Sequence, residues 1–195
     1  MKTKLNRALL AGAIALTCAA CQVEKEADYQ VIPRPQEVSL TQETPFKLNS
    51  SVTIAYPENN ALLKRNAEFL SEYIGQATGY RLAVNPLAEG EKMKNAIVLG
   101  IDPAIPNAEG YKLTTTPDGI RIDGQTENGV FYGIQTLRKS IPADAQGASI
   151  LLPAGSIQDE PRFPYRGMHL DVCRHFFPVE FVKEYIDLLA LHNMN

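Results

Sequence analysis

The sequence predicts an α+β fold, in which an antiparallel or mixed sheet is covered by two helices and is followed by a separate strand–loop–helix unit. Three observations support this prediction. Several short apolar runs are bounded by Pro, Gly and Asn, as strands commonly are. Two longer segments carry apolar residues at helical spacing. Beyond Glu160 the pattern changes to one extended segment and one amphipathic helix. Two structural units are therefore expected after the N-terminal segment.

The N-terminus, residues 1–20, is predicted to be a secretory signal peptide. Three basic residues precede residues 8–20, which contain no charge. This apolar run is shorter than the roughly 20 residues that a membrane-spanning helix needs. Cys21 follows two alanines, which resembles the lipobox of bacterial lipoproteins, in which the cysteine becomes the lipidated N-terminus. Ordinary cleavage, with Cys21 as a bystander, is the alternative.

Residues 21–30 are predicted to be a short charged tether after Cys21. Removal of the signal peptide takes away three positive charges and changes the formal net charge from −3 to −6. We expect a protein of the bacterial cell envelope, lipid-anchored to a membrane on the periplasmic side or the outer surface. A negative charge argues against a nucleic-acid-binding surface. Two of the three cysteines lie in the first 21 residues, so no disulfide framework is expected.

The α+β unit is predicted to cover residues 31–158. Its strands are expected over residues 52–55, 81–84, 96–99, 111–115 and 120–123. The last two are joined by a turn (TPDG), in which Pro117 presets the backbone and Gly119 supplies a positive φ, so they form a hairpin. Residues 31–35 enter in an extended conformation, because each proline keeps the preceding residue out of the α region.

Two amphipathic helices are predicted in this unit. The first covers residues 61–74, with Asn60 as its N-cap and Gly75 at its end. The second begins after Thr126 and continues to Ile141. Their apolar stripes consist of Leu63, Ala67, Leu70 and Ile74 in the first helix, and Val130, Phe131, Ile134, Leu137 and Ile141 in the second.

No catalytic or metal site is predicted in residues 31–158, which contain no His and no Cys. Three glycines, Gly124, Gly129 and Gly133, lack the spacing and the Lys-Ser/Thr of a phosphate-binding loop. They are predicted to let a helix pack closely against the sheet. The segment 109–111 (EGY) is interpreted as a turn into a strand.

The second unit, residues 159–195, is predicted to contain a strand, a loop and a helix. A strand is predicted over residues 167–172, a loop over residues 173–177, and a helix from Pro178 to His192. Such a unit needs a parallel partner strand. We therefore expect it to be the truncated start of a larger domain, with the apolar face of its helix exposed.

Most reactive side chains of this second unit form no recognisable site. The spacing of its histidines, His169, His175 and His192, matches no metal motif, so no metal site is expected. Asp159 and Glu160 are adjacent and point in different directions, which favours solvated surface over a catalytic carboxylate pair. Cys173 has no base placed beside it by any recognisable pattern and is not assigned as a nucleophile.

Arg174 is the strongest binding candidate. It lies just beyond the carboxyl end of the predicted strand. If this unit is the first of a (β/α)₈ barrel, ligand-contacting groups emerge at that position. Its guanidinium offers a planar fork of donors suited to adjacent sugar hydroxyls or a carboxylate. Alternatively, it forms an ion pair with Asp171 that only orders the loop. The spacing alone leaves both interpretations open.

Four motifs, in this order along the chain, resemble the start of a β-N-acetylhexosaminidase of glycoside hydrolase family 20, of the kind found in Bacteroides-like bacteria. They are residues 31–35 (VIPRP), 109–111 (EGY), 129–137 (GVFYGIQTL) and 166–176 (RGMHLDVCRHF). The resemblance implies a small α+β domain placed before a (β/α)₈ catalytic barrel. Residues 159–195 are then the first strand and helix of that barrel, which is truncated.

The resemblance implies an exo-acting enzyme that removes terminal non-reducing N-acetylglucosamine or N-acetylgalactosamine from glycans with retention of configuration. In this family the 2-acetamido oxygen attacks the anomeric carbon, an Asp holds the acetamido group, and the neighbouring Glu is the general acid. That Asp-Glu pair belongs to a later barrel motif that is not in this sequence. No catalytic residue is therefore assigned, no cofactor is expected, and these 195 residues alone are expected to be inactive.

One family residue carries over. The Arg of the Leu-Asp-x-x-Arg-His pattern, which hydrogen-bonds hydroxyls of the bound sugar, corresponds to Arg174. An alternative of a different class is a non-catalytic surface lipoprotein with a structural or glycan-binding role. It predicts saturable sugar binding by residues 31–158, although no aromatic platform is recognisable there.

Overall fold

A computed structural model describes residues 23–88 and 90–195, so the predicted signal peptide and Cys21 lie outside the described residues. Its main element is a seven-stranded sheet. In spatial order the strands are β2 (Glu37–Leu40), β10 (Gly155–Asp159), β7 (Tyr111–Thr116), β8 (Gly119–Gly124), β6 (Ala96–Ile101), β4 (Thr53–Pro57) and β5 (Ala83–Leu87). The first four pair antiparallel and the last four, which share β8, pair parallel. The predicted mixed sheet and its 116–119 hairpin are confirmed.

A second, three-stranded sheet joins segments far apart in the chain. Its spatial order is β1 (Glu24–Glu26), β9 (Ser149–Leu152) and β3 (Phe46–Leu48). Ala27 and Tyr29 are buried directly after β1, and the Tyr29 hydroxyl lies 2.9 Å from Thr115 Oγ1. The predicted tether over residues 21–30 is therefore wrong for residues 24–30. The charged side chains of this segment favour a solvated tether, but the backbone of residues 24–26 pairs with β9.

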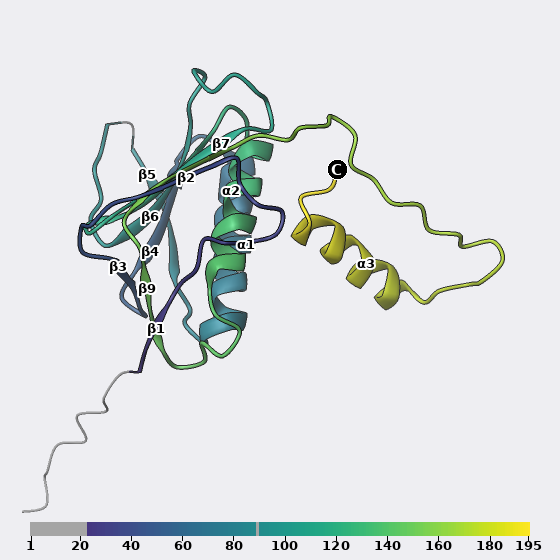
Figure 1. Ribbon diagram of the computed structural model, residues 1–195, viewed down its shortest axis with the longest axis horizontal. Coiled ribbons are helices and arrows are strands. Elements are labelled where there is room, and N and C mark those ends of the chain that lie inside the picture. The colour runs from purple at the N-terminus through teal and green to yellow at the C-terminus, as the bar shows by residue number, and fades with distance from the viewer. Residues whose placement is uncertain (1–22, 89) are drawn as a thin grey trace, which may run out of the picture.

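Two helices, α1 (Ala61–Thr78) and α2 (Glu127–Ser140), cover one face of the seven-stranded sheet (Figure 1). Their N-caps are as predicted. Asn60 Oδ1 accepts the N–H of Leu63 at 2.9 Å, and Thr126 Oγ1 accepts the N–H of Asn128 at 3.2 Å. The predicted stripe of α1 is buried against the sheet, as are Val130, Ile134 and Leu137 of α2.

The end of α1 differs from the prediction by one turn. Gly75 keeps a helical conformation, and the helix ends at Gly79, whose φ is 80°. The N–H of Gly79 donates to the carbonyl of Gly75 at 2.9 Å. Glycine adopts this left-handed conformation without steric cost, which makes Gly79 the natural helix terminator.

The three glycines assigned to close packing have that role. A Cβ on Gly129 would collide with the carbonyl oxygen of Gly110, and one on Gly124 with the backbone of α2. A Cβ on Gly133 would meet the side chains of Ile122 and Tyr111. The absence of side chains therefore lets α2 lie directly on β7 and β8.

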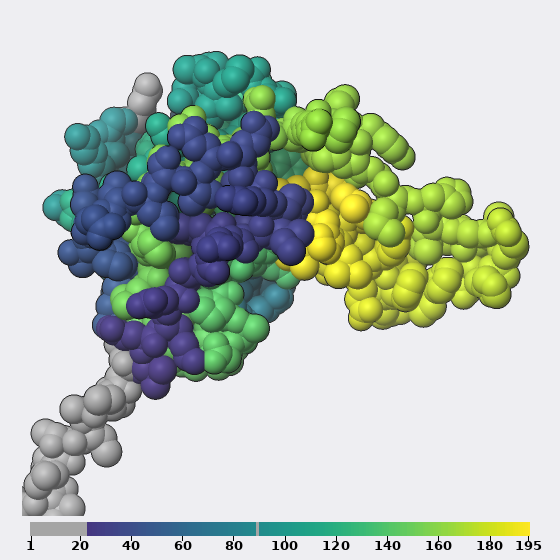
Figure 2. Space-filling model, viewed as in Figure 1, coloured from purple at the N-terminus to yellow at the C-terminus, as the bar shows by residue number. Residues whose placement is uncertain are grey.

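The segment after β10 leaves the α+β domain as an extended chain and returns through α3 (Val179–Leu191), as Figures 1 and 2 show. The helix follows Pro178, which is its N-cap residue and not its first helical residue. No residue of α3 is buried, and Phe181, Ile186 and Leu188 are exposed. The expected bare apolar helix face is therefore present.

The strand predicted over residues 167–172 is not formed. This segment is extended, but it pairs with no strand in the part of the chain that the structure describes. A β-strand is defined by its ladder, so alternation of apolar residues alone does not produce one. Across the same described ranges, no helix is both long enough and apolar enough to cross a membrane.

Candidate functional site

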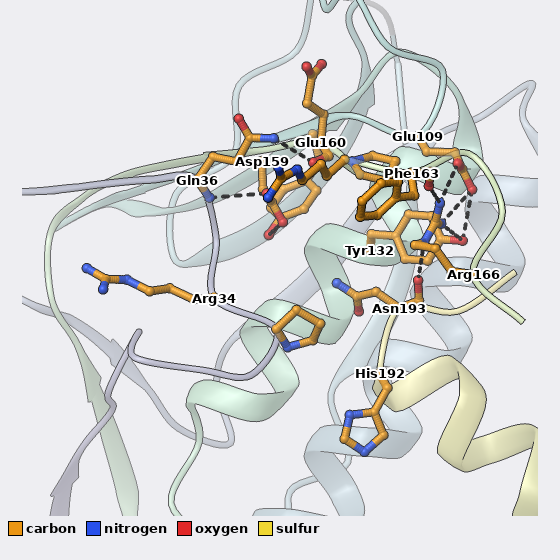
Figure 3. Close-up of a pocket in the computed structure, with 14 residues that line it drawn as sticks. Arg34, Gln36, Glu109, Tyr132, Asp159, Glu160, Phe163, Arg166, His192 and Asn193 are labelled. Atoms are coloured by element: carbon orange, nitrogen blue, oxygen red, sulfur yellow. Dashed lines mark hydrogen bonds and ion pairs between the residues drawn. The ribbon is translucent and has the colours of Figure 1, made fainter. Parts of the chain in front are cut away.

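A cavity of about 570 Å³ lies where the α+β domain meets the C-terminal segment (Figure 3). Part of its wall is formed by the end of β10, by residues 160–163, and by Pro33, Arg34 and Gln36. The remainder comes from Glu109, Tyr111, Tyr132 and Arg166, with His192 and Asn193 after α3. Segments from five parts of the sequence therefore meet at this cavity.

Arg166 is the centre of the polar contacts beside the cavity. Its Nη1 and Nη2 donate to the two carboxylate oxygens of Glu109 at 3.1 and 2.9 Å, in a bidentate ion pair. Nη2 also donates to the Tyr132 hydroxyl at 3.0 Å. Nη1 and Nε donate to the carbonyls of Phe163 and Asn193 at 2.8 and 2.7 Å. All three guanidinium nitrogens are engaged, so Arg166 holds structure and is not available to a ligand.

The electrostatics of this cluster reinforce the ion pair. The side chains of Arg166 and Glu109 are only 17% and 19% exposed. Hydrogen bonds from Arg166 lower the pKa of the Glu109 carboxyl, and Glu109 in turn raises the pKa of Arg166. The Tyr132 hydroxyl donates to Glu109 at 3.1 Å, and burial raises the pKa of Tyr132. Both charges are therefore kept in their ionised forms.

Lys139, near the end of α2, forms a second contact with the C-terminal segment. Its Nζ donates to the carbonyl of Leu191 at 3.0 Å and to Asn193 Oδ1 at 3.3 Å. Burial lowers the pKa of Lys139 to about 8. The ammonium therefore predominates at neutral pH and meets the carbonyl end of α3.

Asp159 is half-buried at the cavity wall, which corrects the prediction of a solvated surface position. Its Oδ1 accepts the N–H of Gln36 at 3.2 Å, and burial raises the pKa of its carboxyl. Glu160, the next residue, is exposed. The two carboxylates therefore occupy different environments, and no catalytic pair is assigned.

Arg174 lies far more exposed than Arg166. Its side chain is 86% exposed, and its Nε lies 2.6 Å from Asp171 Oδ2. Asp171 Oδ1 accepts the N–H groups of Cys173 and Arg174, and these hydrogen bonds lower the pKa of the Asp171 carboxyl. The loop-ordering ion pair with Asp171 is therefore present. The printed contact runs through Nε, on a side chain that is otherwise largely exposed to solvent.

The remaining candidate residues, Cys173 and the three histidines, do not form a common site. Cys173 is a free, exposed thiol, and His169 and His175 are exposed. His192 is the C-cap residue of α3 and borders the cavity. Among the described residues, no group of three or more His, Cys, Asp or Glu side chains is placed to hold a metal ion.

Sequence reasoning missed the role of Glu109 and Arg166. The sequence predicts a turn into a strand at Glu109 and assigns no role to Arg166. Their positions are 57 residues apart, so no local pattern connects them. The one usable signal was that each lies at the edge of one of the four ordered motifs.

Comparison with known families matches two successive segments of the chain. Residues 28–160 match the family described as "Glycosyl hydrolase family 20, domain 2". Residues 163–195 match "Glycosyl hydrolase family 20, catalytic domain". The boundary between the matches falls at the cavity, where the chain leaves β10.

Known proteins similar to the chain are longer. A β-hexosaminidase of Porphyromonas gingivalis is 34% identical over 178 residues, which cover 88% of this chain and 22% of that protein. The solved β-N-acetylhexosaminidase of Streptomyces coelicolor is 32% identical, with a TM-score of 0.74 over 85% of this chain and 33% of that one. The Streptomyces plicatus enzyme, solved with Thio-NAglucal, is 33% identical with a TM-score of 0.72, over the same shares of the two chains. The chain thus spans between a fifth and a third of these relatives.

Proposed function

Because the chain belongs to glycoside hydrolase family 20, we propose that it is the N-terminal part of an exo-β-N-acetylhexosaminidase. The proposed enzyme removes terminal non-reducing N-acetylglucosamine or N-acetylgalactosamine from glycans. The observation that carries this proposal is the match of residues 28–160 and 163–195 to two domains of the family in the order expected for the enzyme. The relative from Streptomyces plicatus, solved with GlcNAc as product, supports the substrate class.

In this proposal Arg174 binds the sugar. A guanidinium presents parallel donors that match two neighbouring hydroxyls. Asp171 takes Nε and two backbone N–H groups, which orders the loop and leaves Nη1 and Nη2 to donate to the ligand. Ion pair and sugar binding, the two alternatives for Arg174, are therefore compatible. The ion pair with Asp171 orients the Arg174 guanidinium before the sugar binds.

The proposed reaction is substrate-assisted hydrolysis with retention. The 2-acetamido oxygen of the sugar attacks the anomeric carbon as the glycosidic bond breaks, and water then opens the resulting oxazolinium. The resemblance assigns the acetamido-holding Asp and the acid Glu to a later barrel motif. The contribution of this chain is binding and orientation by Arg174, and residues 1–195 alone are proposed to be inactive.

We also propose that Cys21 carries a lipid that anchors the protein in the bacterial cell envelope, facing the periplasm or the exterior. The basic residues, the apolar run and the small residues before Cys21 support this proposal. The test is labelling of the expressing cells with an alkynyl fatty acid. Wild-type protein should be labelled and Cys21→Ser unlabelled. Equal labelling of both proteins, or of neither, would refute lipidation at Cys21.

The test of the activity uses two proteins, residues 21–195 and the product of the whole reading frame that contains them. An aryl N-acetylglucosaminide should be hydrolysed by the second and not by the first. In the second, Arg174→Met should raise KM by about tenfold or more, because a charge-assisted contact to the sugar is lost. Arg81→Met, an exposed arginine away from the cavity, is the matched control. A reading frame that stops at codon 195, together with saturable sugar binding by residues 31–158, would instead support a non-catalytic glycan-binding lipoprotein.

A further inference from the structure

Two contacts hold opposite ends of the segment 166–193 to the α+β domain. At its start, Arg166 forms the bidentate pair with Glu109, which lies two residues before β7. At its end, Lys139 of α2 donates to the carbonyl of Leu191 and to Asn193. Both anchoring residues, Glu109 and Lys139, belong to the α+β domain, and Figure 3 shows the first of these contacts.

The two ends of this segment are also held to each other. The N–H of Arg166 donates to Asn195 Oδ1 at 3.0 Å, and the N–H of Asn195 donates to the carbonyl of Arg166 at 3.0 Å. Arg166 Nε donates to the carbonyl of Asn193. The segment is therefore a closed loop with its base on the α+β domain (Figure 1), and Arg174 belongs to this loop.

Polar contacts, and not apolar burial, keep this loop on the domain. No residue of α3 is buried, so the helix gains little from the hydrophobic effect. Its last turn contains no basic residue of its own. The negative end of its dipole is met by Lys139, a cation supplied by α2.

We propose that Glu109 and Lys139 are positioning residues of the hexosaminidase. By clamping both ends of segment 166–193, they fix the direction in which the α+β domain presents the first unit of the barrel, and with it Arg174. The catalytic half of this inference rests on the proposed function. The clamp itself is a property of this chain and is tested without any activity.

The first test measures hydrogen exchange of the α3 amides in the 195-residue chain. Glu109→Gln and Lys139→Met each remove one charge at nearly constant size. Each should raise the exchange rate of α3 by about tenfold, because one charge-assisted contact is lost. Exchange in β6, β7 and β8 should stay unchanged, and Lys139→Arg should restore protection of α3. Lys64→Met, on the exposed face of α1, is the matched control.

Unchanged exchange of α3 in both variants would overturn the clamp. Faster exchange throughout β6, β7 and β8 would also overturn it, because the variants would then act through the whole domain.

The second test measures hydrolysis of an aryl N-acetylglucosaminide by the product of the whole reading frame. Glu109→Gln and Lys139→Met should raise KM several-fold, with Lys139→Arg and Lys64→Met close to wild type. Faster α3 exchange with unchanged kcat and KM would overturn the positioning role. If the wild-type product hydrolyses nothing, the proposed function fails, while the exchange experiment still decides the clamp.

Discussion

Replacing Gly129 by alanine should destabilise the α+β domain by about 2 kcal/mol. In a free helix this substitution stabilises by about 1 kcal/mol, because glycine has the larger backbone entropy to lose. Here the new Cβ would collide with the carbonyl oxygen of Gly110 and approach the Cα of Gly124. These are backbone atoms that cannot rotate away, so α2 must shift from the sheet. Overpacking of this kind costs about 3 kcal/mol. Subtracting the propensity gain of about 1 kcal/mol leaves a net loss of about 2 kcal/mol.

Gly75→Ala in α1 is the matched control. Its Cβ would have only the carbonyl oxygen of Tyr80 within 4 Å, at an ordinary contact distance of 3.4 Å. This variant should be more stable than wild type by about 0.5–1 kcal/mol. Urea unfolding followed by far-ultraviolet circular dichroism and tyrosine fluorescence measures both, since the chain has 8 Tyr and no Trp. The midpoint of Gly129→Ala should fall by about 1 M. If Gly129→Ala unfolds at or above the wild-type midpoint, the close-packing argument is refuted.

Three further changes test the core and the junction by the same urea assay. Leu70→Ala, at a fully buried position, should cost about 3 kcal/mol, whereas Leu62→Ala, at an exposed position of the same helix, should stay within about 0.5 kcal/mol of wild type. Tyr111→Phe should cost about 1–2 kcal/mol, because the buried Thr136 hydroxyl loses its partner at 2.6 Å, and equal stability would contradict this. Burial lowers the pKa of Lys139 to about 8 in the folded protein, below its unfolded value of 10.5, so the unfolded chain binds more protons between these values. The free energy of unfolding of the wild-type protein should therefore rise from pH 8 to pH 10, and that of Lys139→Met should rise less. The same pH dependence in both proteins would contradict the lowered pKa of Lys139.

The sequence predicted those elements whose signals are local. Asn60 and Thr126 cap the two helices, and Pro117 and Gly119 form the turn of the hairpin, all within a few residues of the structure they determine. The choice between Gly75 and Gly79 as helix terminator was harder. Either glycine can adopt a positive φ. The helix continues past Gly75 to Thr78, which is buried, and ends at Gly79, whose φ is 80°.

Elements that depend on distant partners were missed or misplaced. The residues of β1 are charged, and nothing in their own sequence indicates that they pair with β9, more than a hundred residues away. Residues 167–172 show the opposite failure. Their alternation is that of a strand, but a strand also needs a neighbour, and the described residues supply none.

In the candidate site, too, contacts between sequence neighbours could be predicted and contacts between distant residues could not. Arg174 and Asp171 are three residues apart, so their ion pair could be foreseen from spacing. The pairing of Arg166 with Glu109, and of Lys139 with the end of α3, depends on how the second unit returns to the first. Tertiary geometry of this kind is not encoded in any short window.

The position of β1 limits how far the proposed lipid anchor can reach. Only two residues separate Cys21 from Glu24, the first residue of β1, and three extended residues span about 10 Å at most. An acylated Cys21 would thus keep the three-stranded sheet almost flush with the bilayer, without a flexible stalk.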